Sequence, residues 1–122
     1  MTQFVHLHNH SDYSLLDGAQ SIESLVNRAV ELGMPAVGLT EHGNLFSAIH
    51  FLKAANTSGL KPILGCEIYV ADNNRFDKKS REQGGSGYHH LLLLVQNRQG
   101  YENLIKLVSL GYLEGYYYRP RV

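Results

Sequence analysis

The chain has 122 residues, of which 43% are hydrophobic, and its 11 basic side chains are balanced by 11 acidic ones. This composition is typical of one folded domain with its own core, and the balanced charge does not indicate a nucleic-acid, membrane or acidic partner. A single cysteine excludes an internal disulfide, and no apolar run is long enough to span a membrane, so we expect a cytoplasmic protein.

The first third of the chain predicts two strands separated by a helix. A short apolar strand is expected at Phe4–Leu7, followed by a polar loop that runs to Gly18. Ser21 can cap a helix that Gly33 ends, and a second strand is expected at Ala36–Leu39. The helix has apolar residues at helical spacing: Ile22, Leu25, Val26, Ala29 and Val30.

The middle of the chain predicts a second helix and a third strand. Asn44 is expected to cap the helix and Gly59 to end it. Its inward-facing residues are expected to be Phe46, Ile49 and Leu52. The apolar run Pro62–Val70 predicts the third strand, which carries Cys66 and Glu67.

The last third begins with a polar, glycine-rich stretch at 71–88, which we expect to be a mobile loop. His90–Val95 predicts a fourth strand and Tyr101–Leu110 a third helix. The buried stripe of this helix is expected to be Leu104, Ile105, Leu107 and Val108. The chain then ends in a tyrosine- and arginine-rich segment for which no capping element is predicted.

Alternating strands and helices predict an α/β fold with parallel strands, right-handed crossovers and flanking helices. Closed barrels of this kind take about 200 residues or more, so four strands are too few for closure. The alternatives are a small open sheet and the first part of a larger barrel. We favour a partial (β/α) barrel that is truncated before closure.

Histidines and carboxylates collect where the predicted elements meet, and they indicate a metal site. His8 and His10 share one face of the first segment, since residues i and i+2 of a strand point the same way. His42 follows the next strand, and ligands of such sheets bind beyond the carboxyl ends of the strands. Imidazole and carboxylate ligands suit zinc, manganese or iron, and such a cluster is arranged for metal-assisted hydrolysis.

Other candidate ligands have competing structural explanations. Asp17 can be a turn former before Gly18, whereas a buried, unpaired Glu67 would be costly without a metal. His90 begins a strand instead of ending one, so position alone argues against it. Glu41 is expected to point away from the site, either supporting a ligand or facing solvent, and Cys66 to be a small buried apolar residue.

Several segments of the chain resemble the PHP (polymerase and histidinol phosphatase) domain, in the form that opens bacterial DNA polymerase III alpha subunits. The resemblance covers nearly the whole chain. It is carried by Phe4–Gly18 (FVHLHNHSDYSLLDG), Gly33–Asn44 (GMPAVGLTEHGN), Lys61–Glu67 (KPILGCE), Tyr88–Leu91 (YHHL), Asn103–Leu104 and Tyr112–Gly115 (YLEG).

The resemblance implies a distorted (β/α)7 barrel with up to three divalent ions, zinc or manganese, and further ligands downstream of Val122. It implies that His8 and His10 bind one metal, that Glu67 bridges, and that Asp17 joins His42 at another. It also makes His90 a ligand, against the argument from its strand position. Catalysis would run through a metal-activated water held by His8, His10 and Glu67.

The function that this resemblance implies is phosphodiester hydrolysis, as a 3′–5′ proofreading exonuclease, within a replicative polymerase that contacts DNA and other replicase subunits. DNA synthesis would belong to the rest of the parent protein, and residues 1–122 alone should have little or no activity. Arg119 and Arg121, set among tyrosines, could guide a single strand, although packing of these aromatics explains them equally well. The alternatives are a free-standing phosphatase of the histidinol-phosphatase type and a metal-binding scaffold without catalysis.

Overall fold

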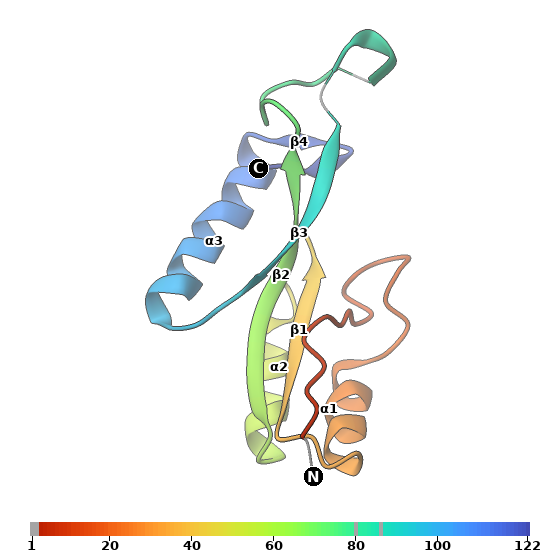
Figure 1. The fold of residues 1–122 in the computed structure, drawn as a ribbon, viewed down its shortest axis with the longest axis vertical. Coiled ribbons are helices and arrows are strands. Elements are labelled where there is room, and N and C mark those ends of the chain that lie inside the picture. Colours follow the sequence, from red (N-terminus) through yellow and green to blue (C-terminus); the bar gives the residue numbers. More distant parts are fainter. Residues whose placement is uncertain (1–2, 80, 86) are drawn as a thin grey trace.

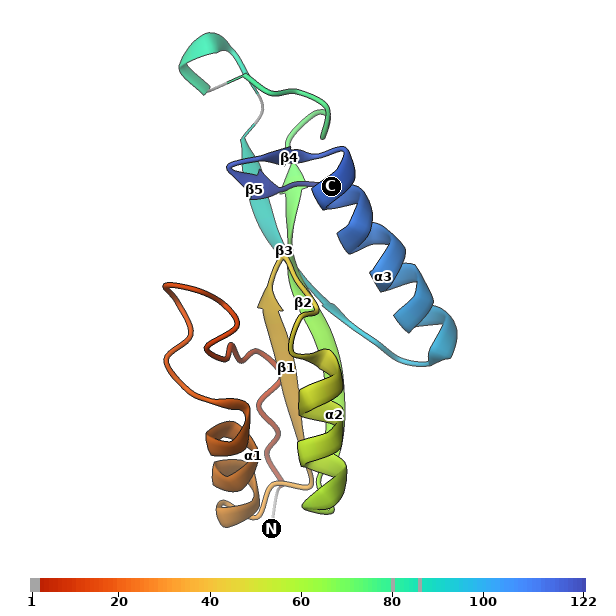
Figure 2. The ribbon, with the colours of Figure 1, turned by 180° about the vertical axis from the view of Figure 1, so that it is seen from behind.

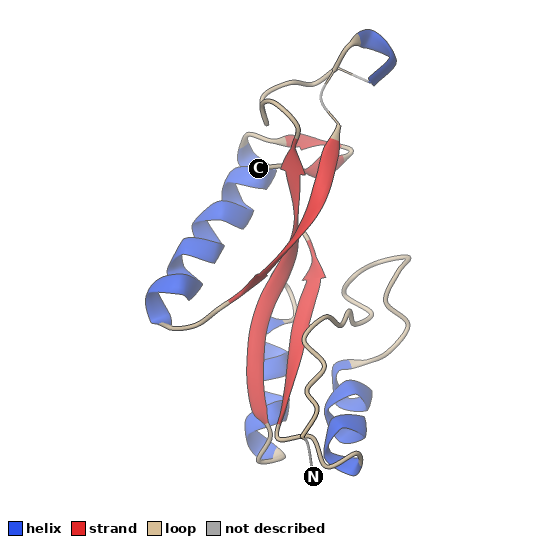
Figure 3. Ribbon diagram, in the orientation of Figure 1, coloured by secondary structure: helices blue, strands red, loops and turns tan. Residues whose placement is uncertain are grey.

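The computed structural model describes residues 3–79, 81–85 and 87–122, and shows an open sheet flanked by three helices (Figures 1 and 3). The predicted mobility of 71–88 remains a prediction, and residues 80 and 86 of that stretch lie outside the described residues. In chain order the elements are α1 (Ile22–Glu31), β1 (Ala36–His42), α2 (Ala48–Thr57), β2 (Lys61–Ala71), the 3-10 turn η1 (Arg81–Gln83), β3 (Tyr88–Leu94), α3 (Arg98–Leu113), β4 (Tyr116–Tyr117) and β5 (Arg119–Pro120).

The sheet is mixed, with strand order β1-β2-β3. β1 and β2 are parallel and are joined through α2, as predicted, whereas β2 and β3 are antiparallel. The prediction of an α/β fold is therefore confirmed, and the prediction that all strands are parallel is wrong for β3. The physical reason is the connection between β2 and β3, whose described residues form no crossover helix to carry the chain back, so β3 returns in the opposite direction.

The predicted first strand, Phe4–Leu7, is not assigned as a strand. The segment nevertheless runs beside β1 in extended form (Figures 1 and 2), where Gly38 N donates to His6 O and Thr40 N donates to Asn9 O. Between these two hydrogen bonds the acceptor moves three residues along the N-terminal segment, from His6 to Asn9, whereas the donor moves only two along β1. The two segments therefore run parallel, but their hydrogen bonds do not form a regular ladder. Gly38 permits this approach, because a Cβ there would lie 2.6 Å from Leu7 O.

The main hydrophobic core lies between α1, α2 and the sheet. Ser21 caps α1 as predicted, accepting from Ser24 N at 3.1 Å. Four of the five apolar positions of α1 are buried, and Val30 is exposed. Odd residues of β1 and even residues of β2 face the helices, which leaves His42 of β1 and Glu67 of β2 on the opposite face. The core comprises Ile22, Leu25, Val26, Ala29, Val37, Leu39, Ala48, Phe51, Ala55, Leu60 and Leu64.

The prediction for α2 is wrong in its cap and its buried face. The helix starts after Ser47, and the Asn44 side chain instead accepts from Phe46 N to form a turn before the helix. Phe51 and two alanines face the core, whereas Phe46 lies before the helix and is 68% exposed, and Ile49 is 57% exposed. Leu52 is only partly buried.

The third helix is longer than predicted at both ends, since Asn97 caps it by accepting from Gly100 N. Leu104 packs on Cys66 and Ile68 of β2, with Leu107 and Val108 partly buried around them. Ile105 belongs to the predicted stripe but is 40% exposed. Among the described residues, no helix is both long and apolar enough to cross a membrane.

The C-terminal segment forms a small hairpin, β4–β5, where no element was predicted. Its last residues pair with β2 beyond the end of β1: Val122 N donates to Tyr69 O and Ala71 N donates to Val122 O. The hairpin approaches Gly43, whose φ is +61° and whose Cβ would lie 2.8 Å from Pro120 Cγ. This packing brings the tyrosine-rich segment to the end of the sheet where β1 finishes.

Candidate metal centre

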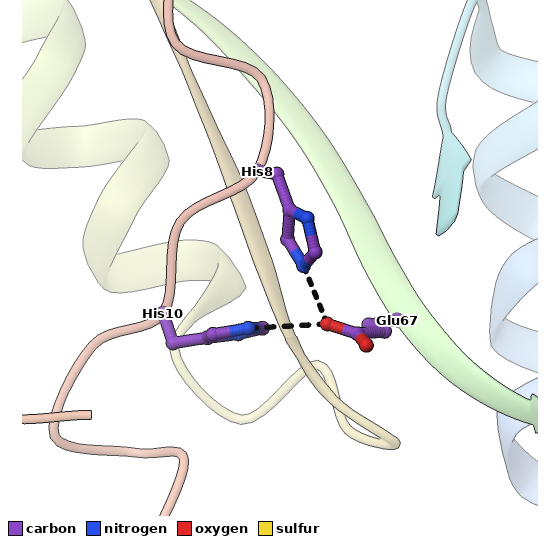
Figure 4. A group of neighbouring side chains, drawn as sticks. All are labelled: His8, His10 and Glu67. Atoms are coloured by element: carbon purple, nitrogen blue, oxygen red, sulfur yellow. Dashed lines mark hydrogen bonds and ion pairs between the residues drawn. The ribbon is translucent and has the colours of Figure 1, made fainter. Parts of the chain in front are cut away.

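Four histidines converge on one carboxylate, that of Glu67 on β2. His8 and His10 reach it from the extended N-terminal segment beside β1, which Figure 4 shows. His42 is the last residue of β1 and is the register partner of Glu67. His90 lies near the start of β3, opposite Tyr69. Because β3 is antiparallel, its first residues lie at the same end of the sheet where β1 finishes, and this removes the positional argument against His90.

The first group comprises His8, His10 and Glu67 (Figure 4). The Oε2 atom of Glu67 lies 2.5 Å from His8 Nε2 and 3.1 Å from His10 Nε2. Glu67 is only 6% exposed, so its carboxylate depends on these partners for the interactions that water would otherwise supply. The group therefore presents two imidazole nitrogens and one carboxylate oxygen to a common point.

The second group shares Glu67 and adds His42 and His90. Glu67 Oε1 lies 2.5 Å from His90 Nδ1, and Oε2 lies 3.7 Å from His42 Nδ1. The His10 and His42 rings are stacked with centroids 4.0 Å apart, which places the two groups side by side. Glu67 can thus offer one oxygen to each side, which is the arrangement of a bridging carboxylate.

Asp17 joins the cluster through His42 and not through Glu67. Its Oδ2 atom lies 2.9 Å from His42 Nε2, and the Asp17 side chain is 65% exposed. The structure therefore brings all six candidate residues into one continuous cluster, with Asp17 at its solvent edge.

The chemistry of this cluster fits a divalent metal. Within the part of the chain that the structure describes, His10 Nδ1 and His42 Nδ1 are buried nitrogens without a hydrogen-bond partner. Buried polar atoms normally have partners, so these two nitrogens call for an explanation such as a cation. Imidazole with carboxylate suits zinc, manganese or iron better than calcium.

The surroundings also favour the protonation states that metal binding needs. Burial lowers the pKa of His42, and the neighbouring His10 lowers it further, so both favour the neutral ring. Burial alone would raise the pKa of Glu67, but hydrogen bonds from His8 and His90 outweigh it and the pKa falls below its usual value. A neutral imidazole and an ionised carboxylate are the ligand forms of these side chains.

Glu41 is a residue whose role the sequence left open, because it could either support a ligand or face solvent. It is 2% exposed and points to the helix side of β1, so the surface alternative is wrong. Its carboxylate accepts from Ser11 N at 3.1 Å, from Ser47 Oγ at 3.1 Å, and from the hydroxyls of Ser11 and Ser14. Three serines placed around one glutamate are the sequence signal that could have indicated this buried carboxylate.

The Glu41 network positions two members of the cluster of candidate ligands. Ser14 Oγ, which donates to Glu41, also accepts from His42 N at 3.0 Å. Ser14 O accepts from Asp17 N at 3.1 Å and from Gly18 N at 2.8 Å. Glu41 therefore fixes the loop that presents Asp17 to His42.

The two arginines near the C-terminus have different environments. Arg121 is 1% exposed, donates to the backbone carbonyls of Gly115 and Asp77, and lies over the Tyr117 ring, so it stabilises the hairpin from inside. Arg119 is exposed, with its guanidinium carbon 5.9 Å from the Tyr69 ring centroid. Of the two, only Arg119 is placed to meet a ligand. Cys66 is fully buried on the helix side, and burial raises the pKa of its thiol to about 12.

Known proteins are similar to this chain in sequence. Over 121 residues the chain is 52% identical to the DNA polymerase III subunit alpha of Borreliella burgdorferi, and over 119 residues it is 54% identical to that of Treponema pallidum. These alignments cover 99% and 98% of the chain, but only 10% of each relative, so the chain spans about a tenth of the length of these curated relatives.

Solved structures with low sequence identity share the fold. A crystal structure from Bifidobacterium adolescentis, described as a candidate metal-dependent phosphoesterase, matches with a TM-score of 0.60 at 21% identity, covering 92% of this chain and 35% of that one. An amidohydrolase from Chromobacterium violaceum matches with a TM-score of 0.58 at 20% identity, covering 87% and 34%. Residues 6–122 match the PHP domain family, and the chain therefore belongs to that family.

Proposed function

We propose that this chain is the N-terminal PHP segment of a bacterial replicative DNA polymerase III alpha subunit, and that its metal centre hydrolyses phosphodiesters as a 3′–5′ exonuclease. The observation that carries the proposal is the single buried carboxylate of Glu67, which lies between two groups of imidazoles. Identity of about half over nearly the whole chain supports the polymerase context. In that context the partners of the protein would be DNA and other replicase subunits, and its location would be the cytoplasm.

The candidate ligands would hold two neighbouring ions. His8, His10 and Glu67 would hold one ion, and His42, Glu67, His90 and Asp17 would hold a neighbouring one. The complete domain would contain up to three ions, zinc or manganese. When bound, such ions supply a water with a lowered pKa and a positive charge for the phosphate oxygens. Glu67 and Asp17 supply the negative charge that keeps the cluster together.

The test uses the intact protein that contains this segment, a labelled primer–template and Mn²⁺. The proposal predicts stepwise loss of 3′ nucleotides by the wild type, and a loss of this activity of at least about a hundredfold in Glu67→Gln, because charge and bridge are removed together. The matched control is Glu102→Gln, on the exposed surface of α3, which should keep wild-type trimming.

Two other outcomes would replace the proposal. Release of phosphate from histidinol phosphate without primer trimming would make the site a small-molecule phosphatase. Bound metal with neither activity would make the segment a scaffold that binds ions without catalysis.

A further inference from the structure

A cavity of about 240 Å³ opens directly beside the metal cluster. His42 and Asp17 form part of its lining, so anything held in the cavity would contact the cluster. The other walls come from the loop that carries Tyr13, the β1–α2 connection with Phe46, β2 with Tyr69, the end of α3 with Tyr112, and the β4–β5 hairpin. The position of the hairpin is visible at the end of the sheet in Figure 2.

The lining is unusually rich in aromatic rings. Tyr69, which is only 6% exposed, lies nearly parallel to His42, with centroids 6.2 Å apart and ring planes at 20°. Tyr112 and Tyr116 are stacked at 6.0 Å and 24°. Tyr116 is 53% exposed and Tyr118 is 77% exposed, so both present ring surface that no core contact covers. Such rings offer flat faces on which a planar heterocycle can stack.

Arg119 adds a positive charge to this aromatic wall. It lines the cavity between Tyr118 and Pro120, and its guanidinium lies over Tyr69. A guanidinium recognises phosphate oxygens through paired hydrogen bonds. The cavity therefore combines surfaces for a flat ring, a cation for a phosphate, and the metal cluster at one side.

Tyr118 is held in an uncommon backbone conformation. Its φ is +59°, in the left-handed region that non-glycine residues seldom adopt. It forms the tip of the hairpin, because Tyr117 pairs with Arg119 across it. A strained position that carries an exposed aromatic ring at the mouth of a cavity points to binding, since strain of this kind collects at functional sites.

We propose that this cavity binds one nucleoside unit of the phosphodiester substrate, with the base stacked on the tyrosine rings and the adjoining phosphate contacted by Arg119. This inference rests on the proposed function, and it adds that the site selects esters by their base. The cavity is smaller than the roughly 300–1,000 Å³ of sites for drug-sized ligands, which suits a single unit and not a longer strand.

The experiment compares two primers in the intact protein that contains this segment. They differ only in the 3′-terminal residue, which is a normal nucleotide in one and an abasic residue in the other. The variants are Tyr118→Asn and Tyr118→Phe. Asparagine adopts the left-handed conformation more readily than most residues, so the first variant removes the ring without adding backbone strain. Phe76→Ala, an exposed aromatic outside the cavity, is the control.

We expect the wild type to remove the normal nucleotide with roughly tenfold higher kcat/KM than the abasic residue, as one lost base stack implies. Tyr118→Asn should reduce this ratio to near one, while Tyr118→Phe and Phe76→Ala keep it. Equal rates on both primers in the wild type, or an equal loss on both in Tyr118→Asn, would overturn the inference and leave the exonuclease proposal standing.

A binding measurement decides the inference if neither primer is cleaved, which would refute the proposed function. Calorimetry would compare thymidine 5′-monophosphate with 2-deoxyribose 5-phosphate in the same variants. The inference expects base-dependent binding that weakens about tenfold in Tyr118→Asn alone. Only the difference between variants counts, because other parts of a larger protein can bind nucleotides. Identical binding in all variants would overturn the inference.

Discussion

The Oε1 atom of Glu67 lies 2.5 Å from Nδ1 of His90, although these residues belong to neighbouring strands that run in opposite directions. The antiparallel return of β3 puts its first residues next to the end of β1, where the other histidines gather. Glu67 can therefore contact the N-terminal histidines with one oxygen and His90 with the other. Both groups of candidate ligands depend on this single side chain.

Removing the charge of Glu67 should weaken metal binding in both groups. We expect Mn²⁺ titration of the wild type to include two ions that depend on this cluster, one for each group. Glu67→Gln should lower both affinities by at least about a hundredfold, since the lost group is a ligand and even outer partners contribute 10–100-fold. His8→Gln should weaken Mn²⁺ binding only in the group that contains His8 and His10. Isothermal titration calorimetry would measure Mn²⁺ binding to the wild type and to both variants.

The control for that titration is His50→Gln. His50 of α2 pairs with Glu23 of α1 and belongs to neither group of candidate ligands, so its replacement should leave Mn²⁺ binding unchanged. Unaltered affinity in Glu67→Gln, with the chain still folded, would remove Glu67 from the metal centre.

Loss of the Glu41 carboxylate should loosen the loop that carries Asp17. An amide cannot accept from all the donors that the carboxylate serves, and a buried donor left without a partner costs about 1–3 kcal/mol. Glu41→Gln should therefore speed amide hydrogen exchange in residues 11–18 by roughly 5- to 150-fold. Hydrogen-exchange mass spectrometry checks this peptide by peptide. Glu31→Gln, which breaks an exposed ion pair on α1, should leave the exchange of 11–18 unchanged.

The cluster could be predicted from the sequence because its members lie at the ends of apolar runs. His8 and His10 share a face by simple alternation, and His42 follows a strand, so their convergence could be predicted. Glu41 could not be interpreted in the same way. Its partners Ser11, Ser14 and Ser47 are brought together only by tertiary folding, and neutral serines carry little signal on their own.

The errors in the fold have local causes. For β3, an apolar run predicts a strand but says nothing about its direction, which depends on whether the preceding connection contains a helix. For α2, Asn44 and Ser47 are both good capping residues, and the first was chosen wrongly. The predicted inward residues Ile49 and Leu52 are each one position from the buried Ala48 and Phe51, because the large apolar residues were favoured over alanine. Phe4–Leu7 has the composition of a strand, but its out-of-step pairing with β1 prevents a regular ladder.

Acid should destabilise the metal-free chain in two steps. The pKa of His42 is lowered below its ordinary value of 6.5, so its stabilising effect is complete above pH 6.5 and is lost as the pH falls toward the lowered value. The pKa of Glu67 is lowered below 4.5, so its contribution is present above pH 4.5 and disappears on further acidification. Thermal unfolding in EDTA should show Tm falling in both windows. His42→Gln should flatten the first window, and an unchanged pH dependence in this variant would contradict the assignment.

The thiol of Cys66 should be inert in the folded chain. Burial raises its pKa to about 12, so almost no thiolate exists at pH 8, and no solvent path reaches the sulfur. Iodoacetamide treatment followed by peptide mapping should find the Cys66 peptide unmodified in native protein and fully modified after unfolding in urea. Rapid labelling of the native protein would show that α3 does not cover β2 as described.

Anomalous diffraction from crystals that contain Mn²⁺ tests the central claim most directly, because it locates each ion. The account predicts one peak between His8, His10 and Glu67, and a second between His42, His90 and Glu67, with the Glu67 carboxylate contacting both. Peaks elsewhere in the molecule, or a Glu67 side chain turned away from both groups of histidines, would contradict it.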